Sequence, residues 1–170
     1  LDDQKYEPFR EEWAYEIKEK DKKTIIKHLN RGGGLLGLHT AAICFDTWDD
    51  WNSILGVQWV WNQTFHPPPK RFQVFASSHK HPATSNIQSF EIDDEIYHYL
   101  KTIPETTPLL YTNEGEDNTV QELAWAHTNM KGRVIYSSIA HDEISIAAHG
   151  HSKFLRQSAL WCIGERLEEN

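Results

Sequence analysis

The chain has few cysteines, no long apolar run and no apolar leader at its start. Cys44 and Cys162 are the only cysteines among 170 residues, and each lies in an apolar context. This is typical of buried thiols in a reducing compartment rather than of a disulfide framework. No stretch approaches the roughly 18 apolar residues that a membrane-spanning helix needs, and the charged first residues lack the apolar core of a signal peptide. We therefore expect a cytoplasmic protein that has no membrane partner.

Basic residues are also scarce. The chain has 25 acidic against 17 basic residues and a formal net charge of −8, whereas a nucleic-acid-binding protein needs a basic footprint. We therefore expect no nucleic-acid partner. The aromatic content of 12%, with seven Trp, argues against disorder, and 170 residues can bury the core of one domain. The expected organisation is a single domain over 1–170, with a helical extension at 1–20 and an α/β body at 21–167.

Apolar periodicity predicts a chain of alternating helices and strands. The helical pattern at 21–30 ends at Gly32, and the glycine-bounded apolar run GLLGLH at 34–39 is typical of a buried strand. Other patterns predict helices over 8–19, 41–56 and 152–167 and strands over 71–77, 107–114, 122–128 and 132–140. A helix, a glycine turn and a buried strand form half of a parallel α/β unit. The expected fold is therefore a flavodoxin-like, three-layer α/β/α structure with a mostly parallel sheet, which lacks its N-terminal strands because nothing strand-like precedes residue 34.

Two histidines come directly at the ends of predicted buried strands. His39 ends the apolar run at 34–39, and His141 follows the strand at 132–140. Ligands of α/β proteins bind at the carboxyl ends of the strands, so we expect both side chains at one rim. An imidazole there can serve as a base, an acid or a metal ligand. The alternative for any single histidine is a solvated or structural side chain.

Two acidic segments lie near these histidines or could reach them, and the role of each segment has two possible interpretations. Asp142 and Glu143 follow His141 and either cap a short helix or orient the imidazole in one tautomer, and the two roles are compatible. The acidic stretch FEIDDEIYHY at 90–99 either forms a solvated face or turns Asp94 or Glu95 inward. Two histidines and one carboxylate suit zinc, iron or manganese. No compact H-x-x-x-H spacing accompanies them.

Aromatic residues alternate in VQWVWNQTFH, where Trp59 and Trp61 flank Val60. One face of this segment is therefore aromatic. Sugar rings can stack their C–H faces on such flat apolar surfaces. The alternative is that both rings cover the core.

The order of motifs resembles that of the trehalose-utilisation (ThuA-like) family. The similarity covers residues 22–165 and rests on GGGLLGLHTA, ILGVQW, FHPPP, HPAT, IDDEIY, LAWAHTNMKGRVIYSSIAHDE and ALWCIGE. It implies a flavodoxin-like fold related to the class I glutamine amidotransferases. Those enzymes have a cysteine at the position of His39, whereas His141 and Glu143 keep their His-x-Glu form. Without that cysteine, glutamine hydrolysis through a thioester is not expected.

The resemblance also implies that His39, His66, His81, Glu95 and His141, with Tyr97 beside them, are polar positions of the pocket. Together with the aromatic face and the two-histidine, one-carboxylate set, it leads to two groups of candidate residues. The expected metal ligands are His39, Glu95 and His141, and the expected substrate-binding residues are His66, His81, Trp59, Trp61 and Tyr97. The chain departs from the family pattern where no glycine pair follows Leu55. Family members are associated with the catabolism of trehalose and related disaccharides, including 3-keto sugars.

These observations predict a carbohydrate-processing protein of the sugar isomerase, lyase or hydrolase type. His39, His141 and Glu143 are the candidate catalytic residues, and one candidate step is proton abstraction next to a carbonyl, with a divalent metal as a candidate cofactor. The expected partner is a small-molecule carbohydrate, and a homo-oligomer is compatible with the sequence. The alternative is a non-catalytic, amidotransferase-like domain that has lost its nucleophilic cysteine and binds a sugar or a partner.

Overall fold

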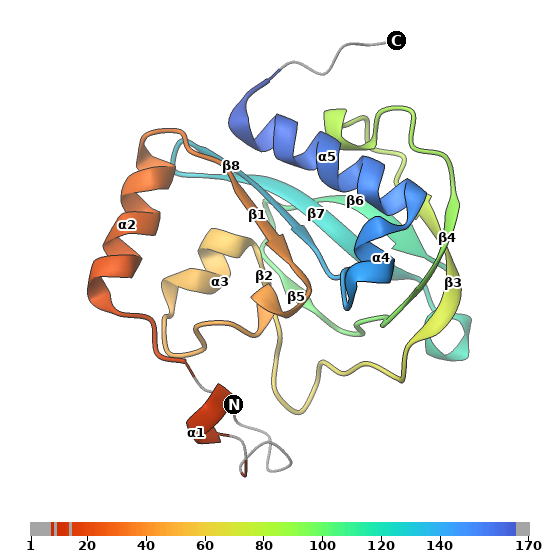
Figure 1. The fold of residues 1–170 in the computed structure, drawn as a ribbon, viewed down its shortest axis with the longest axis horizontal. Coiled ribbons are helices and arrows are strands. Elements are labelled where there is room, and N and C mark those ends of the chain that lie inside the picture. The colour runs from red at the N-terminus through yellow and green to blue at the C-terminus, as the bar shows by residue number, and fades with distance from the viewer. Residues whose placement is uncertain (1–7, 9, 14, 166–170) are drawn as a thin grey trace.

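A six-stranded sheet forms the centre of the protein (Figure 1). The structure is a computed structural model and describes residue 8, residues 10–13 and residues 15–165. In spatial order, the strands are β1 (Leu35–Leu38), β8 (Gly132–Ser137), β7 (Gln121–Asn129), β6 (Thr107–Thr112), β3 (Lys70–Ala76) and β4 (Phe90–Asp94). A separate antiparallel pair consists of β2 (Val57–Gln58) and β5 (Lys101–Thr102).

Helices cover both faces of the sheet, so the three-layer arrangement and the α/β class are confirmed. The α-helices are α1 (Arg10–Trp13), α2 (Glu19–Asn30), α3 (Asp50–Leu55), α4 (Glu143–Ala147) and α5 (His149–Ile163), and the 3-10 turns are η2 (His39–Ala42), η3 (Pro82–Thr84) and η4 (Glu116–Asn118). Along β8, Val134 and Tyr136 join the core cluster under α2 and α3, whereas Ile135 joins the cluster under α5. This alternation follows from the two-residue repeat of a strand. In Figure 1, α2 stands beside the β1 edge and α5 crosses the sheet.

The expectation of a mostly parallel sheet is wrong. Only the β1–β8 pair is parallel, and the other pairs in the six-stranded sheet are antiparallel. The physical reason is the length of the connections, because parallel neighbours need a crossover of roughly a dozen residues or more. Between β7 and β8, Met130 and Lys131 alone form the turn, with Asn129 paired to Gly132.

The helix predicted over 41–56 is also wrong for its first half. The chain forms η2 and then turns, and only α3 is α-helical. Phe45 has a φ of 56°, in the left-handed region, which no right-handed helix can include. Cys44 lies in these turns and is exposed, contrary to the expectation that it is buried, whereas Cys162 is buried as expected.

The other predicted elements agree with the structure except at their ends. The single helix expected over 8–19 is an exception and is wrong: α1 ends at Trp13, residues 15–18 are not helical, Glu19 begins α2, and residues 9 and 14 lie outside the described residues. The last strand ends at Ser137 rather than at residue 140. The closing helix begins at His149 and ends before Gly164, whose φ of 85° is the left-handed conformation typical of a helix end. None of the described helices has the length and apolarity that crossing a membrane requires.

Candidate functional site

The histidines that follow β1 and β8 meet at one end of the sheet. Because β1 and β8 run parallel with Leu38 opposite Ser137, the residues that follow the two strands leave the sheet at the same end. The ring centroids of His39 and His141 lie 5.3 Å apart, with an interplanar angle of 72°. The two imidazoles therefore share one rim, as the sequence predicted.

The backbone at His39 turns sharply as the chain leaves β1. Leu38 is extended, and His39 has a φ of 45°, which is an uncommon conformation for a residue with a Cβ atom. The Tyr136 hydroxyl donates a hydrogen bond of 2.8 Å to the His39 carbonyl and holds this turn. In many hydrolases, a strained turn between a strand and a helix exposes the nucleophile. Here the same kind of turn presents an imidazole.

Glu95 is the centre of the site. Its Oε2 lies 3.1 Å from His39 Nε2, and its Oε1 lies 3.2 Å from His66 Nδ1 and 3.4 Å from His141 Nδ1. The side chain of Glu95 is 7% exposed. One buried carboxylate thus contacts imidazoles from three separate segments of the chain.

The charge of Glu95 is stabilised by these neighbours. Burial acts to raise the pKa of its carboxyl group, while the hydrogen bond with His39 and the charges of His66, His141 and His39 lower it. The histidines together outweigh burial, and the pKa is below its ordinary value. Glu95 is therefore ionised at neutral pH, as a buried carboxylate can be when it has partners.

Aromatic side chains extend the site on the other side of His39. The Tyr97 hydroxyl lies 2.9 Å from His39 Nε2 and 3.2 Å from its Nδ1, and Tyr97 is buried. The ring centroid of Trp59 lies 5.0 Å from that of Tyr97, 6.1 Å from that of His66 and 6.2 Å from that of Trp61. The structure therefore brings four of the five predicted substrate-binding residues together near Glu95.

Asp94 fixes the loop that carries His141. Asp94 is 1% exposed, and its Oδ2 accepts hydrogen bonds from the backbone N–H of Ala140 at 2.9 Å and of His141 at 3.3 Å. Its Oδ1 accepts a hydrogen bond of 2.6 Å from the Glu95 N–H. Asp94 and Glu95, the two acidic residues that were candidates to turn inward, are therefore both buried and bonded. Asp94 binds the backbone, and Glu95 binds the imidazoles.

The carboxylates that follow His141 in the chain serve α4. Asp142 accepts a hydrogen bond of 2.8 Å from the Ser145 N–H and caps the helix, and this bond lowers its pKa. Glu143 is exposed in the first turn, and its side chain makes no hydrogen bond or ion pair to another described residue. The carboxylate that contacts His141 is therefore Glu95. The catalytic role expected of Glu143 stays a prediction.

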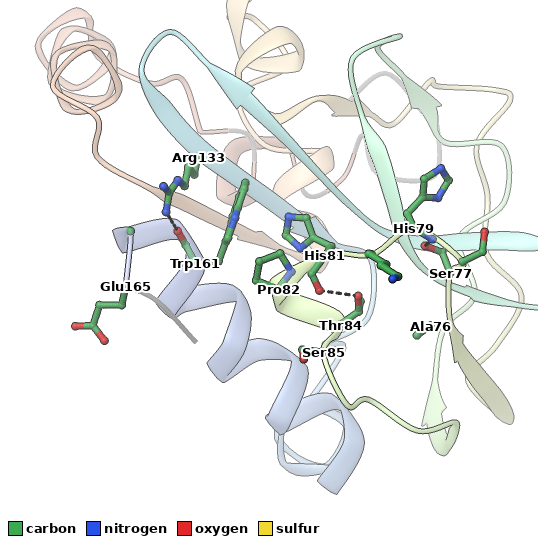
Figure 2. Close-up of a pocket in the computed structure, with 13 residues that line it drawn as sticks. Ala76, Ser77, His79, His81, Pro82, Thr84, Ser85, Arg133, Trp161 and Glu165 are labelled. Atoms are coloured by element: carbon green, nitrogen blue, oxygen red, sulfur yellow. Dashed lines mark hydrogen bonds between the residues drawn. The ribbon is translucent and has the colours of Figure 1, made fainter. Parts of the chain in front are cut away.

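His81 lies away from the cluster around Glu95. Its Nδ1 accepts a hydrogen bond of 3.1 Å from the Ala83 N–H, and its ring lies 4.6 Å from that of Trp161 (Figure 2). It shares a cavity with Arg133, which stands near the start of β8, whereas His141 follows the end of that strand. The structure therefore separates His81 from the other predicted substrate-binding residues.

The residues at the rim fit a divalent metal ion. His39, Glu95 and His141 each offer one ligand atom, and these atoms lie within 4.8 Å of one another. Two imidazoles and one carboxylate form a ligand set that zinc, iron and manganese all accept. The group could therefore hold a metal.

Comparisons with known proteins agree with the fold and the motifs. The family model for trehalose utilisation, ThuA, matches residues 11–162. A ThuA-like protein from Parabacteroides merdae is 15% identical with a TM-score of 0.78, and the match covers 92% of this chain and 71% of that one. A ThuA-like protein from Bacteroides uniformis is 19% identical with a TM-score of 0.64, and the match covers 85% and 64%. A cytoplasmic protein from Salmonella typhimurium is 15% identical with a TM-score of 0.60, and the match covers 91% and 63%.

The extent of these matches limits what they show. The chain spans 71% of the first of these structures and less than two thirds of the other two. No curated protein shows a significant match to the chain. At such low identities the solved structures show the shared fold, and the family model shows the family.

Proposed function

Because the chain belongs to the ThuA (trehalose utilisation) family, we propose that it converts trehalose or a related keto-disaccharide at the cluster of His39, Glu95 and His141. The substrate is then a small-molecule carbohydrate, and the protein works in the cytoplasm. The observation that carries the proposal is the contact of one buried carboxylate with imidazoles from three segments. Perturbed, convergent ionisable groups of this kind are concentrated at functional sites.

Glu95 prepares His141 to take a proton from the sugar. The ionised carboxylate lies next to His141 Nδ1, so it favours the tautomer with the proton on Nδ1 and leaves Nε2 as the basic atom. The side chain of His141 is 42% exposed, and a substrate can therefore reach it. An imidazole held in this way suits abstraction of a proton from a carbon next to a carbonyl group.

The Tyr97 hydroxyl, which contacts His39, is the proposed hydrogen-bond donor to a substrate oxygen. This 2.9 Å contact joins two polar groups in a buried part of the site, where donors stabilise a developing oxyanion more strongly than in water. Trp59 and Trp61 supply flat apolar surface for the sugar ring. His66, whose side chain is 29% exposed, is placed to contact a sugar hydroxyl.

A divalent metal would be held by His39, Glu95 and His141. When bound, zinc, iron or manganese would supply Lewis-acid stabilisation of negative charge on a substrate oxygen. The same three residues hold one another by hydrogen bonds and ion pairs, so ligation would replace those contacts. Variants of His39, Glu95 and His141 can therefore be measured for both metal binding and sugar binding.

Metal analysis and sugar titration of the purified protein test the proposal. We expect the wild type to bind 3-keto-trehalose in calorimetry, and a bound zinc, iron or manganese ion would be held by His39, Glu95 and His141. Glu95→Gln should lose sugar binding, together with any metal that the wild type contains. Glu91→Gln is the matched control, because Glu91 is an exposed acid of β4 four residues away.

The outcomes separate the proposal from its alternative. If Glu95→Gln binds sugar and metal as the control does, the assignment of the site is refuted. If the wild type binds the sugar without a metal and converts none of a panel of keto-disaccharides, the protein is instead a non-catalytic sugar-binding domain. Glu143→Gln decides the remaining sequence prediction, since loss of turnover in that variant would assign the exposed Glu143 a catalytic role.

A further inference from the structure

A cavity lies at the opposite end of the sheet from Glu95. It has a volume of about 810 Å³ and is bounded by the loop at 76–85, by Arg133 of β8 and by the end of α5 (Figure 2). Small-ligand sites typically measure roughly 300–1,000 Å³, so the cavity has the size of a metabolite site. Nothing in the proposed sugar chemistry uses it.

Trp161 forms a fixed wall of this cavity. The Arg133 guanidinium carbon lies 5.5 Å from the centre of the Trp161 ring, and the His81 ring centroid lies 4.6 Å from it in a T-shaped contact. Figure 2 shows Trp161 between the other two side chains. His81 accepts the Ala83 N–H at Nδ1, and burial lowers its pKa. The His81 ring is therefore neutral at neutral pH and acts as part of the wall.

Positive charge in the cavity is not balanced. Arg133 donates one hydrogen bond of 2.9 Å to the Trp161 carbonyl, and no carboxylate of the described residues pairs with it. Lys80 is exposed on the facing loop and also makes no ion pair within the described part of the chain. Among the lining residues, Glu165 is the only acid. The cavity is therefore lined by two cationic side chains, Lys80 and Arg133, and one acidic side chain, whereas the whole chain has a formal net charge of −8.

Neutral donors accompany these cations. The hydroxyl groups of Ser78 and Ser85 line the cavity and form no hydrogen bond with another described residue. The planar guanidinium of Arg133 keeps further N–H groups after its bond to Trp161, because the group has five donors. Guanidinium, ammonium and hydroxyl donors together suit the oxygen atoms of a phosphate or carboxylate group.

We propose that this cavity binds the oxyanion group of a small hydroxylated metabolite. Arg133 and Lys80, which both line the cavity, supply its cationic contacts, and Ser78 and Ser85 add neutral hydrogen bonds. The carboxylate of Glu165 accepts hydrogen bonds from the hydroxyl groups of the ligand. The cavity is a site separate from Glu95, and its occupancy does not depend on the proposed sugar conversion.

A titration of the ¹⁵N-labelled full chain followed by NMR tests this proposal. The probes are inorganic phosphate, glucose 6-phosphate, gluconate and neutral glucose. We expect glucose 6-phosphate or gluconate to shift the amide signals of Ser78, Ser85 and Gly164 and the indole signal of Trp161 until they saturate. Neutral glucose should leave these signals unchanged. Whichever of glucose 6-phosphate and gluconate binds more tightly identifies the bound group as a phosphate ester or a carboxylate.

Charge-removing variants give the quantitative test. Lys80→Gln and Arg133→Gln should each weaken the binding of the better probe about tenfold, the effect expected for one charge-assisted hydrogen bond. Lys101→Gln, which removes an exposed charge of β5 outside the cavity, should change nothing. Lys80 is the decisive position because its exposed side chain makes no contact that folding needs.

Three results would overturn the proposal. The first is that no anion produces saturable shifts. The second is that the shifts fall on the residues around Glu95 and disappear in Glu95→Gln. The third is that Lys80→Gln binds the better probe as tightly as Lys101→Gln does. Loss of sugar conversion in Glu95→Gln with unchanged anion binding would support two independent sites.

Discussion

Replacing Glu95 by Gln should destabilise the protein measurably. The amide has the shape of the carboxylate, but it has no charge and turns one acceptor oxygen into a donor NH₂ group. The contact with His39 joins side chains that are 11% and 7% exposed, so it keeps the strength of a buried charged hydrogen bond. The contacts with His66 and His141, whose side chains are 29% and 42% exposed, are weakened by solvent.

The expected loss is therefore close to that of one charge-assisted hydrogen bond, about 2 kcal/mol. For a domain of this size, such a loss lowers the melting temperature by about 4–8 °C. Urea unfolding followed by circular dichroism measures the free energy, and Glu91→Gln is the control. Glu91 is exposed, and its substitution should have almost no effect.

The pH dependence gives a second, independent check. The pKa of Glu95 is below its ordinary value in the folded protein, so the unfolded state binds a proton first as the pH falls. The stabilisation is therefore fully present above about pH 5 and is lost as the pH falls through the ordinary range of glutamate near 4 and below. The difference between wild type and Glu95→Gln should shrink over that range. The reasoning is refuted if the variant is as stable as Glu91→Gln, or if the difference does not depend on acidification.

Three further predictions concern Asp94, the turn at Met130 and the two cysteines. Asp94→Asn should cost about 1–3 kcal/mol in urea unfolding, since its carboxylate accepts three backbone hydrogen bonds; equal stability to Asp93→Asn, an exposed neighbour, would contradict this. Met130→Gly should raise the melting temperature by about 1–3 °C, because Met130 is 49% exposed and has a φ of 55°; a fall would show that its side chain packs. Burial raises the pKa of the Cys162 thiol to about 11, so a thiol reagent should modify only Cys44 in the folded protein and both cysteines in denaturant; rapid modification of two thiols in the folded state would be inconsistent with this burial.

Local sequence patterns predicted the elements better than their pairing. The glycine-bounded run before His39 is a strand because an apolar segment of this length fits the middle of a three-layer fold. The direction of the other strands depends on connections and on partners far apart in the chain, which periodicity does not report. The tight turn at Met130 and Lys131 was the available signal for an antiparallel pair.

The site was predictable where it depends on the ends of strands. His39 and His141 could be placed at one rim because they follow apolar strands, and parallel pairing of β1 with β8 brings them together. The expected burial holds for β8, whereas β1 is the partly buried edge strand of the sheet. The carboxylate was harder to assign. Glu143 is two residues from His141 in the chain, but the start of α4 uses this segment as a cap and a first turn. Glu95 reaches the histidines only through the packing of β4 against the loop after β8, which Asp94 secures.

His81 shows the limit of motif-based assignment. The family resemblance implied that His81 belongs to the same pocket as the other histidines, yet His81 caps η3 and packs on Trp161. A motif fixes the local turn, but it does not fix which end of the sheet the turn occupies. The position follows from the antiparallel course of β3, which carries the loop to the end of the sheet opposite Glu95.

Deuterium uptake tests the central claim most directly. If His141, oriented by Glu95, removes a proton next to a carbonyl group, then 3-keto-trehalose incubated with the protein in D₂O incorporates deuterium at that carbon, which ¹H NMR detects. We predict incorporation with the wild type and with His149→Asn, an exposed histidine of α5, and none above background with His141→Asn or Glu95→Gln. Equal incorporation by His141→Asn and the wild type would contradict the account.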